Sequence, residues 1–210
     1  MTKVVILDYG LGNLANVARA IQKFTDQVFI SDQSREIASA SHLILPGVGA
    51  FGDGMLELQQ RELVDAIQQH VQQGKPLLGI CLGMQLLFSD SEEFGFYQGL
   101  NIIAGSVKKM PANQGETRLR KIPHIGWSAL ALINAQQNSI FHHINQSDEV
   151  YFVHSYMAHV QDASHVLATI DYCGLTIPAI VNKDNVFGMQ FHPEKSAQPG
   201  LQLINNFLES

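Results

Sequence analysis

The sequence predicts an α/β fold: a mostly parallel central sheet flanked by helices, with additional antiparallel strands. The first observation is a series of short apolar runs in the first half, at residues 4–7, 43–45 and 77–80. Runs of this kind are typical of strands that are buried on both faces of a parallel sheet. The second observation is a change of pattern near residue 102, after which segments of strand character follow one another directly. A parallel sheet that carries extra antiparallel strands is the most economical arrangement of such a sequence.

Length and composition favour one globular domain over residues 1–210. The chain has 210 residues, of which 46% are hydrophobic and 15% charged, and no Pro-, Gly- or Ser-rich linker divides it. Its net charge of -6 argues against a nucleic-acid partner, which requires a basic patch. No apolar run approaches the roughly 18 residues that cross a bilayer, and no signal peptide is apparent. We therefore expect a cytoplasmic protein with no nucleic-acid or membrane partner.

The two cysteines, Cys81 and Cys173, do not make a disulfide framework. The histidines show no spacing typical of metal ligands, so we expect no metal site and no cofactor.

Apolar spacing and N-cap residues predict the elements of the first half. In chain order we expect a strand over 4–7, a helix capped by Asn13 and running to Phe24, a strand over 28–30, a short helix capped by Ser34, a strand over 43–45, an amphipathic helix over 60–73, a strand over 77–80 and a helix over 82–88. Residues 89–99 are acidic and contain glycine, which predicts a loop.

The second half is expected to be mostly extended. The predicted strands are 102–107, 119–122, 128–132, 149–156, 165–170, 177–181 and 187–191, followed by a closing helix over 198–209.

Cys81 lies in the sequence Gly79-Ile80-Cys81-Leu82-Gly83, between a predicted strand and a predicted helix. This is the cysteine counterpart of the Gly-x-Ser-x-Gly nucleophile elbow. The glycines are needed because a sharp strand-to-helix turn crowds the backbone, and the turn places the thiol at a helix N-terminus. The alternative is a small buried core cysteine, which is what most cysteines are.

His192 and Glu194 stand two residues apart at the end of an apolar strand pattern. A thiol nucleophile needs a base, and the base needs an orienting group. Residues i and i+2 of an extended chain face the same side, and Pro193 biases His192 towards that conformation. A lone His-x-Glu is usually a solvated strand end, but together with the elbow it predicts a Cys81/His192/Glu194 triad.

This combination resembles the class I (triad-type) glutamine amidotransferases. Four further motifs resemble the glutaminase subunits of imidazole glycerol phosphate synthase, the HisH family, and they occupy residues 7–14, 45–49, 123–127 and 151–156. The resemblance covers essentially the whole chain and implies the flavodoxin-like fold of class I amidotransferases. One departure is Ser128, which stands where the family usually continues Gly-Trp with Asn, and this puts the role of that side chain in question.

The resemblance also implies a glutamine site. Backbone N–H groups of Gly47, Val48 and Gly49 and of Leu82 would form the oxyanion hole, and the glycine-rich loop could flip a peptide because glycine permits both orientations. The residues implied in glutamine binding are Gln85, Ser155 and Tyr156. Without the resemblance, the loop is a tight strand–helix connection and Gln85 a helix-surface residue. Glu92 and Glu93 border the pocket in the family, but they are equally plausible solvated charges.

The reaction implied is hydrolysis of L-glutamine to glutamate and ammonia, and no remaining stretch of the chain could form a synthase domain. The resemblance therefore implies a heterodimer with the cyclase subunit, which uses the ammonia to make imidazole glycerol phosphate and an aminoimidazole carboxamide ribonucleotide in histidine biosynthesis. Candidate interface residues are Asn13, Trp127 and Lys195.

Three other interpretations remain open at this point. The chain could be the glutaminase of another amidotransferase, serving surface-sugar amidation or aminodeoxychorismate, anthranilate or pyridoxal phosphate synthesis. It could be a free-standing thiol hydrolase of γ-glutamyl compounds. It could be a nucleotide-binding module, because Gly10-x-Gly12-x-x-Ala15 followed by Asp32 satisfies a short dinucleotide fingerprint.

Overall fold

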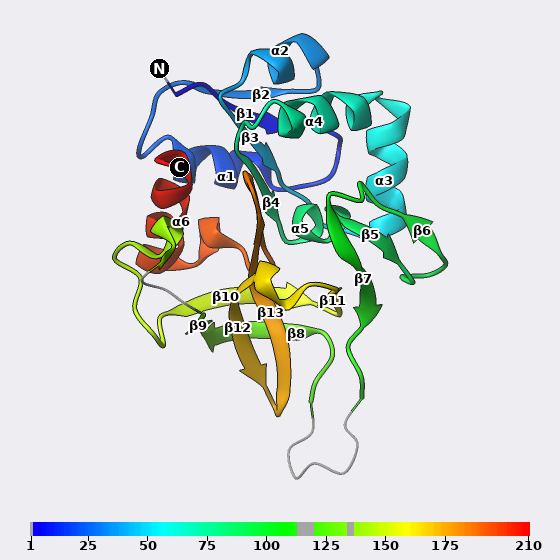
Figure 1. Cartoon of the computed structure of the whole chain (residues 1–210), viewed down its shortest axis with the longest axis vertical. Coiled ribbons are helices and arrows are strands. Elements are labelled where there is room, and N and C mark those ends of the chain that lie inside the picture. The colour runs from blue at the N-terminus through cyan, green and yellow to red at the C-terminus, as the bar shows by residue number, and fades with distance from the viewer. Residues whose placement is uncertain (1, 113–119, 134–136) are drawn as a thin grey trace.

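The computed structural model describes residues 2–112, 120–133 and 137–210. Its centre is an eight-stranded sheet in the order β2-β1-β3-β4-β14-β13-β12-β9 (Figure 1). The first five of these are mutually parallel: β2 (Val28–Ser31), β1 (Val4–Leu7), β3 (His42–Leu45), β4 (Leu77–Ile80) and β14 (Val186–Met189). The other three continue the sheet antiparallel: β13 (Leu175–Lys183), β12 (Val166–Tyr172) and β9 (Ala131–Leu132). The predicted mostly parallel sheet with antiparallel additions is confirmed.

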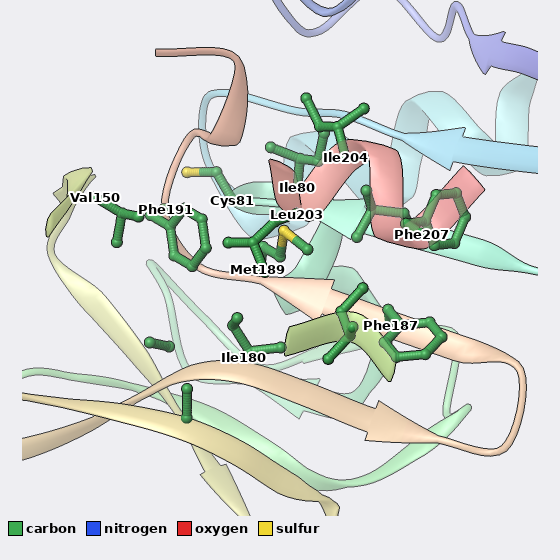
Figure 2. Packing of buried hydrophobic residues seen from close by; sticks show 14 of the residues in the cluster. Ile80, Cys81, Val150, Ile180, Phe187, Met189, Phe191, Leu203, Ile204 and Phe207 are labelled. Carbon is green, nitrogen blue, oxygen red and sulfur yellow. The ribbon is translucent and has the colours of Figure 1, made fainter. Parts of the chain in front are cut away.

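Helices cover both faces of the parallel strands, and each face has its own apolar core. Alternate residues of β1 point to opposite sides, so that Val4 and Ile6 pack with one set of helices and Val5 and Leu7 with the other. On the first side lie α1 (Leu14–Ile21) and α6 (Ala197–Leu208), which contact each other. Figure 2 shows this core, in which side chains of α6 pack near Ile80 and Met189. On the second side lie α2 (Ser34–Ser39), α3 (Phe51–Gln60) and α4 (Leu63–Gln72).

Two smaller sheets lie beside the main one. The first pairs β8 (His124–Ala129) with β10 (Glu149–His154) in antiparallel fashion. The second has the order β11-β7-β5-β6, made of β11 (Tyr156–Val160), β7 (Ile103–Lys109), β5 (Phe88–Ser91) and β6 (Tyr97–Gln98). Single 3-10 turns occupy Ser139–Phe141, Ala163–His165 and Pro193–Lys195.

Several element boundaries differ from the sequence prediction. Helix α3 is not predicted at all, and the predicted helix over 60–73 begins only at Leu63, because Glu62 has a left-handed backbone (φ 57°) that separates α3 from α4. The side chain of Ser34 does not cap α2. Ser34 is the first residue of the helix, and Gln33 holds the cap position without a capping hydrogen bond from its side chain. Asn13 caps α1 as predicted, by accepting a hydrogen bond from the Asn16 N–H.

The region after the elbow also differs. The predicted helix over 82–88 is the shorter helix α5 (Leu82–Leu86), and the predicted loop over 89–99 contains most of β5 and all of β6. The predicted strand over 149–156 is two strands, β10 and β11, which belong to different sheets. The strand predicted over 119–122 begins in a segment that lies outside the described residues, and residues 120–122 are not in a strand. In the part of the chain that is described, no helix is both long and apolar enough to cross a membrane.

Candidate active site

Cys81 is held at a strained turn between β4 and α5 (Leu82–Leu86). Its backbone has φ 54° and ψ -108°, a conformation that residues other than glycine rarely adopt. The flanking glycines are sterically required: a Cβ on Gly79 would lie 2.7 Å from the Gly83 carbonyl oxygen, and one on Gly83 would lie 1.7 Å from the Leu45 carbonyl oxygen. The Cys81 N–H donates to the Met189 carbonyl at 2.8 Å, which ties the elbow to β14. The geometry is that of a nucleophile elbow.

His192 and Glu194 meet in a buried pair next to this turn. The His192 Nδ1 and the Glu194 Oε1 are 2.8 Å apart, and only 4% and 1% of the two side chains is exposed. The backbone that brings the two side chains together differs from the predicted one. Strand β14 ends at Met189, and Glu194 lies in the 3-10 turn Pro193–Lys195 and not in an extended segment. Only His192 keeps the extended backbone expected before a proline.

The surroundings of His192 favour its protonated form. Burial is the strongest single influence and lowers the pKa of His192, but the nearby Cys81 and the hydrogen-bonded Glu194 together outweigh burial and raise this pKa to about 9. The second ring nitrogen, Nε2, is buried and has no partner at hydrogen-bond distance among the described residues. Both Cys81 and His192 line the same cavity, of about 290 Å³. The thiol and the imidazole can therefore act on one molecule bound in this cavity.

The oxyanion loop, residues 46–50, is not arranged as predicted. The Leu82 N–H donates to the Gly47 carbonyl oxygen at 3.4 Å, so the expected oxyanion donor already has an acceptor. The C=O and N–H groups of a trans peptide point in opposite directions. The Val48 N–H, which shares a peptide with the Gly47 carbonyl, is therefore turned away from Leu82. The loop therefore offers the Gly47 carbonyl to the elbow, and in this conformation the Val48 N–H does not face the elbow as predicted.

Tyr9 anchors the loop through a buried hydrogen bond. Its hydroxyl donates to the Pro46 carbonyl at 2.6 Å, and its side chain is fully buried. Burial, reinforced by the nearby Cys81, raises the pKa of Tyr9, so the hydroxyl remains a donor. A Cβ on Gly47 would lie 2.2 Å from this hydroxyl, which explains why the position next to Pro46 must be glycine.

The pocket brings together most of the predicted site residues. Its walls include Val48, Gly49, Cys81, Leu82, Gln85, Glu93, Val153, His154, Ser155, Tyr156 and His192. Gln85 is buried and not on the helix surface: its Nε2 donates to the Tyr156 carbonyl at 3.2 Å and to Gln190 Oε1 at 3.0 Å. Gly47 is absent from the lining but contacts it through the Leu82 N–H.

Glu93 proves to be a pocket residue, and Glu92 does not. Glu93 is 8% exposed and accepts a hydrogen bond at 2.8 Å from the Phe51 N–H at the start of α3. Burial raises the pKa of Glu93, although the Phe51 hydrogen bond acts in the opposite direction. A buried carboxylate in this pocket can receive an ammonium group. Two adjacent glutamates in an acidic segment do not reveal by themselves which one turns inward.

A buried histidine pair supports the pocket from the β8–β10 sheet, and sequence reasoning missed it. His124 and His154 are direct partners in this sheet, and His124 Nδ1 lies 3.2 Å from His154 Nε2. His154 Nδ1 donates to the Tyr156 carbonyl at 2.8 Å, and Ser128 Oγ lies 3.1 Å from His124 Nε2. Burial lowers the pKa of both histidines to about 4, so both are neutral at neutral pH. Ser128, the departure from the family pattern, is thus the outermost member of this series of hydrogen-bonded side chains.

Two of the three candidate interface residues line a second groove. This groove has a volume of about 470 Å³ and is lined by Asn16, Arg19, Ala20, Lys23, Trp127, Glu194, Lys195, Ala197 and Leu201. Trp127 is 49% exposed and packs edge to face on Tyr151. Asn13 does not line the groove. It caps helix α1, and Asn16 and Arg19 of that helix do line the groove. Glu194 lines this groove and also pairs with His192, so the groove lies directly behind the His192–Glu194 pair.

Comparisons with known proteins agree with this geometry. The family model described as "Glutamine amidotransferase class-I" matches residues 5–210. The chain is 46% identical to "Imidazole glycerol phosphate synthase subunit HisH 1" of Legionella pneumophila (strain Lens), covering 100% of both chains. It is 47% identical to the HisH subunit of Syntrophotalea carbinolica, over 97% of this chain and 98% of that one.

Solved structures share the fold. One titled "Structure of PurLQS from Thermotoga maritima" matches with a TM-score of 0.73 at 18% identity and covers 100% of this chain and 99% of that one. Another, titled "Crystal structure of glutamine amidotransferase", matches with a TM-score of 0.73 at 17% identity, over 98% and 97% of the two chains. With the full-length sequence matches, these findings leave the dinucleotide interpretation of residues 10–32 without support. The chain belongs to the class I glutamine amidotransferases, and within them to the HisH family.

Proposed function

We propose that this chain hydrolyses L-glutamine with Cys81 as nucleophile, His192 as general acid and base, and Glu194 as the group that orients His192. As a member of the HisH family, the chain is the glutaminase subunit of imidazole glycerol phosphate synthase. The observation that carries the residue assignment is the buried His192–Glu194 pair, 2.8 Å apart, beside a thiol on a strained elbow.

The chemistry follows from the positions of these groups. His192 holds the thiol proton, and the Cys81 sulfur attacks the side-chain carbonyl carbon of glutamine. The imidazolium then gives the proton to the leaving amide nitrogen, so that ammonia departs and a γ-glutamyl thioester remains. Water, deprotonated by His192, attacks the thioester and releases glutamate and the thiol. Glu93 is placed to bind the glutamine ammonium group, and Ser155 and Tyr156 form the adjacent wall.

The oxyanion requires a change in the loop. The tetrahedral intermediate needs N–H donors, but the Leu82 N–H is bonded to the Gly47 carbonyl. Rotation of the Gly47–Val48 peptide would remove this carbonyl and direct the Val48 N–H towards the elbow, leaving two donors for the oxyanion. The observed conformation is therefore proposed to be a resting state with low activity.

The partner proposed is the cyclase subunit, which accepts the ammonia. The groove behind Glu194 carries an exposed tryptophan and three cationic side chains, Arg19, Lys23 and Lys195. Aromatic and arginine side chains are enriched in protein interfaces, so the groove is suited to a partner with acidic groups. A cytoplasmic location is part of the same proposal, since the nucleophile must stay reduced.

The experiment that tests this function measures glutamate release from glutamine by the chain alone, then with the cyclase subunit, then with its nucleotide substrate as well. We expect strong release of glutamate only in the full mixture. In the chain alone the Leu82 N–H donates to the Gly47 carbonyl and is not available to the oxyanion. The Cys81→Ala variant should release no glutamate while it still folds and binds the partner. Full release by the chain alone would favour a free-standing hydrolase, and retained turnover by Cys81→Ala would refute the mechanism.

A further inference from the structure

Gln190 is a fully buried polar residue to which the mechanism above gives no role. It lies just after β14, two residues before His192, and has no exposed surface. Its side-chain amide stands between two residues of the active site. Gln190 Oε1 accepts from Gln85 Nε2 at 3.0 Å, and Gln190 Nε2 points at Cys81 Sγ at 4.0 Å. Burying an amide costs free energy unless both of its ends find partners, so the placement requires an explanation.

The direction of the Gln190 amide is fixed by its neighbours. The Tyr156 carbonyl oxygen can only accept, so the Gln85 group that approaches it at 3.2 Å must be the NH₂ group. That same NH₂ group reaches Gln190, so the Gln190 atom facing it must be the oxygen. The Gln190 NH₂ group is therefore left facing the sulfur of Cys81.

The Tyr156 carbonyl is itself held in place. His154 Nδ1 donates to it at 2.8 Å, which fixes His154 Nε2 as an acceptor towards His124. The amides of Gln85 and Gln190 are thus the inner part of a hydrogen-bonded series that starts at the β8–β10 sheet and ends at the nucleophile. All of its members are buried or half-buried, and hydrogen bonds in such surroundings strengthen one another.

We propose that Gln190 is a catalytic residue that donates an N–H to the Cys81 sulfur and holds it as a thiolate aimed at glutamine. This inference rests on the triad proposed above and adds a contact to its reacting atom. A thiolate can only accept hydrogen bonds, so a fixed N–H stabilises the charged sulfur and does so more strongly than it does the thiol. His192 stabilises the same charge as imidazolium, and Gln190 does so from the chain segment just before it.

The sharpest test is Gln190→Glu, which keeps the oxygen that Gln85 needs and replaces only the NH₂ group that faces the sulfur. We expect kcat for glutamate release by the complex with the cyclase subunit to fall roughly tenfold or more, the range of a hydrogen bond to a charged group. KM should stay within about threefold, because Gln85 keeps its acceptor and hence its position. Gln190→Met, which removes both ends of the amide, should lower kcat to a similar extent and also raise KM.

A second readout does not depend on glutamine or on the partner. Alkylation of Cys81 by iodoacetamide at neutral pH, followed by peptide mapping to separate it from Cys173, reports the thiolate directly. We expect alkylation of Cys81 to slow by a similar factor in Gln190→Glu and Gln190→Met, while Cys173 reacts as before. The control Gln146→Glu makes the same change at an exposed glutamine whose side chain, among the described residues, bonds only to Leu132, and it should leave both measurements unchanged.

The outcomes separate the two proposals. If Cys81→Ala abolishes glutamate release while both Gln190 variants keep kcat and Cys81 alkylation within twofold of the unmodified protein, the triad stands and the role of Gln190 is refuted. If Cys81→Ala retains turnover, the triad falls and the role of Gln190 falls with it. A thermal unfolding midpoint close to that of the unmodified protein excludes misfolding as the cause of a loss in Gln190→Glu.

Discussion

The Cys81 elbow and the oxyanion loop over 46–50 share one hydrogen bond, yet they are built in opposite ways. At the elbow, added Cβ atoms on Gly79 and Gly83 would collide with backbone atoms at 2.7 and 1.7 Å, so the backbone there is closely packed on both sides of Cys81. In the loop, a Cβ on Gly49 would meet no described atom within 4 Å, and the Val48 side chain is 42% exposed. Cys81, the proposed nucleophile, is thus fixed by packing, whereas the proposed Val48 N–H donor lies on a segment with room to rearrange.

Gly83→Ala should break the rigid side of this comparison and have the largest effect. Its Cβ would overlap the Leu45 carbonyl oxygen, which belongs to β3 and cannot move without disturbing the sheet. We expect the free energy of unfolding, measured by urea denaturation, to fall by about 3 kcal/mol or more. A loss below about 1 kcal/mol would show that the elbow can relax and is not fixed by packing.

Glu194→Gln tests the charge that supports the fixed thiol. Removing the carboxylate should lower the pKa of His192 from about 9 and reduce glutamate release roughly tenfold to a hundredfold without abolishing it. Titration of the His192 ring by NMR measures the pKa directly. The exposed variant Glu209→Gln makes the same change in net charge and should alter neither quantity.

The same pair predicts a pH dependence of stability. Because the pKa of His192 is raised in the folded protein, from an ordinary value of 6.5 to about 9, its contribution is complete below about pH 6.5 and is lost as the pH rises through 9. The contribution is of the order of 3 kcal/mol at most. Urea denaturation at pH 6 and pH 10 should show a smaller decrease for Glu194→Gln than for the unmodified protein; an equal decrease would contradict the assignment.

Tyr9→Phe tests the anchor of the loop. The change leaves the Pro46 carbonyl buried without its donor, which should lower the free energy of unfolding by about 1–2 kcal/mol. With the anchor gone, release by the chain alone should rise a few-fold, and the stimulation by the partner should shrink. Tyr172→Phe is a matched control, since its hydroxyl also donates to a carbonyl, that of Lys121 at 2.6 Å, but at an exposed site. Equal stimulation in Tyr9→Phe and the unmodified protein would refute the anchor.

Gly49→Ala should have the smallest effect on stability and the most local one. Gly49 has φ 121°, so alanine is strained there by about 1 kcal/mol although it meets no described neighbour. We expect partner-stimulated release to fall several-fold. Gly74→Ala shares the positive φ (74°) and the open surroundings away from the site, so it should show the same loss of stability with unchanged release. If both variants release glutamate equally, loop rearrangement at Gly49 is not needed.

The elbow and the parallel strands could be predicted from the sequence because short-range rules determine them. The Gly-x-Cys-x-Gly spacing and the apolar runs carry the information locally, and β1, β3 and β4 lie where these runs predict them. Helix α3 escaped prediction because Gly52 and Gly54 look like loop residues. The structure shows that Gly54 allows Leu82 and Leu86 of α5 to pack closely, and that the Tyr97 ring occupies the space beside Gly52.

Long-range pairings could not be predicted in the same way. His124 and His154 become neighbours only through the register of β8 and β10, which no local pattern reveals. The contact of Gln190 with Cys81 likewise depends on the pairing of β14 with β4. The actual state of the oxyanion loop depends on one peptide orientation, and the sequence Pro46-Gly47-Val48-Gly49 is compatible with both orientations.

The hydrogen bond between the Leu82 N–H and the Gly47 carbonyl has a thermodynamic consequence. If the cyclase subunit favours the loop conformation in which this bond is broken, it increases the affinity for any ligand that carries an oxyanion by some factor. Coupling free energies between two binding sites are reciprocal, so such a ligand must tighten the subunit complex by the same factor. A ligand that binds without needing the Leu82 donor would leave the strength of the complex unchanged.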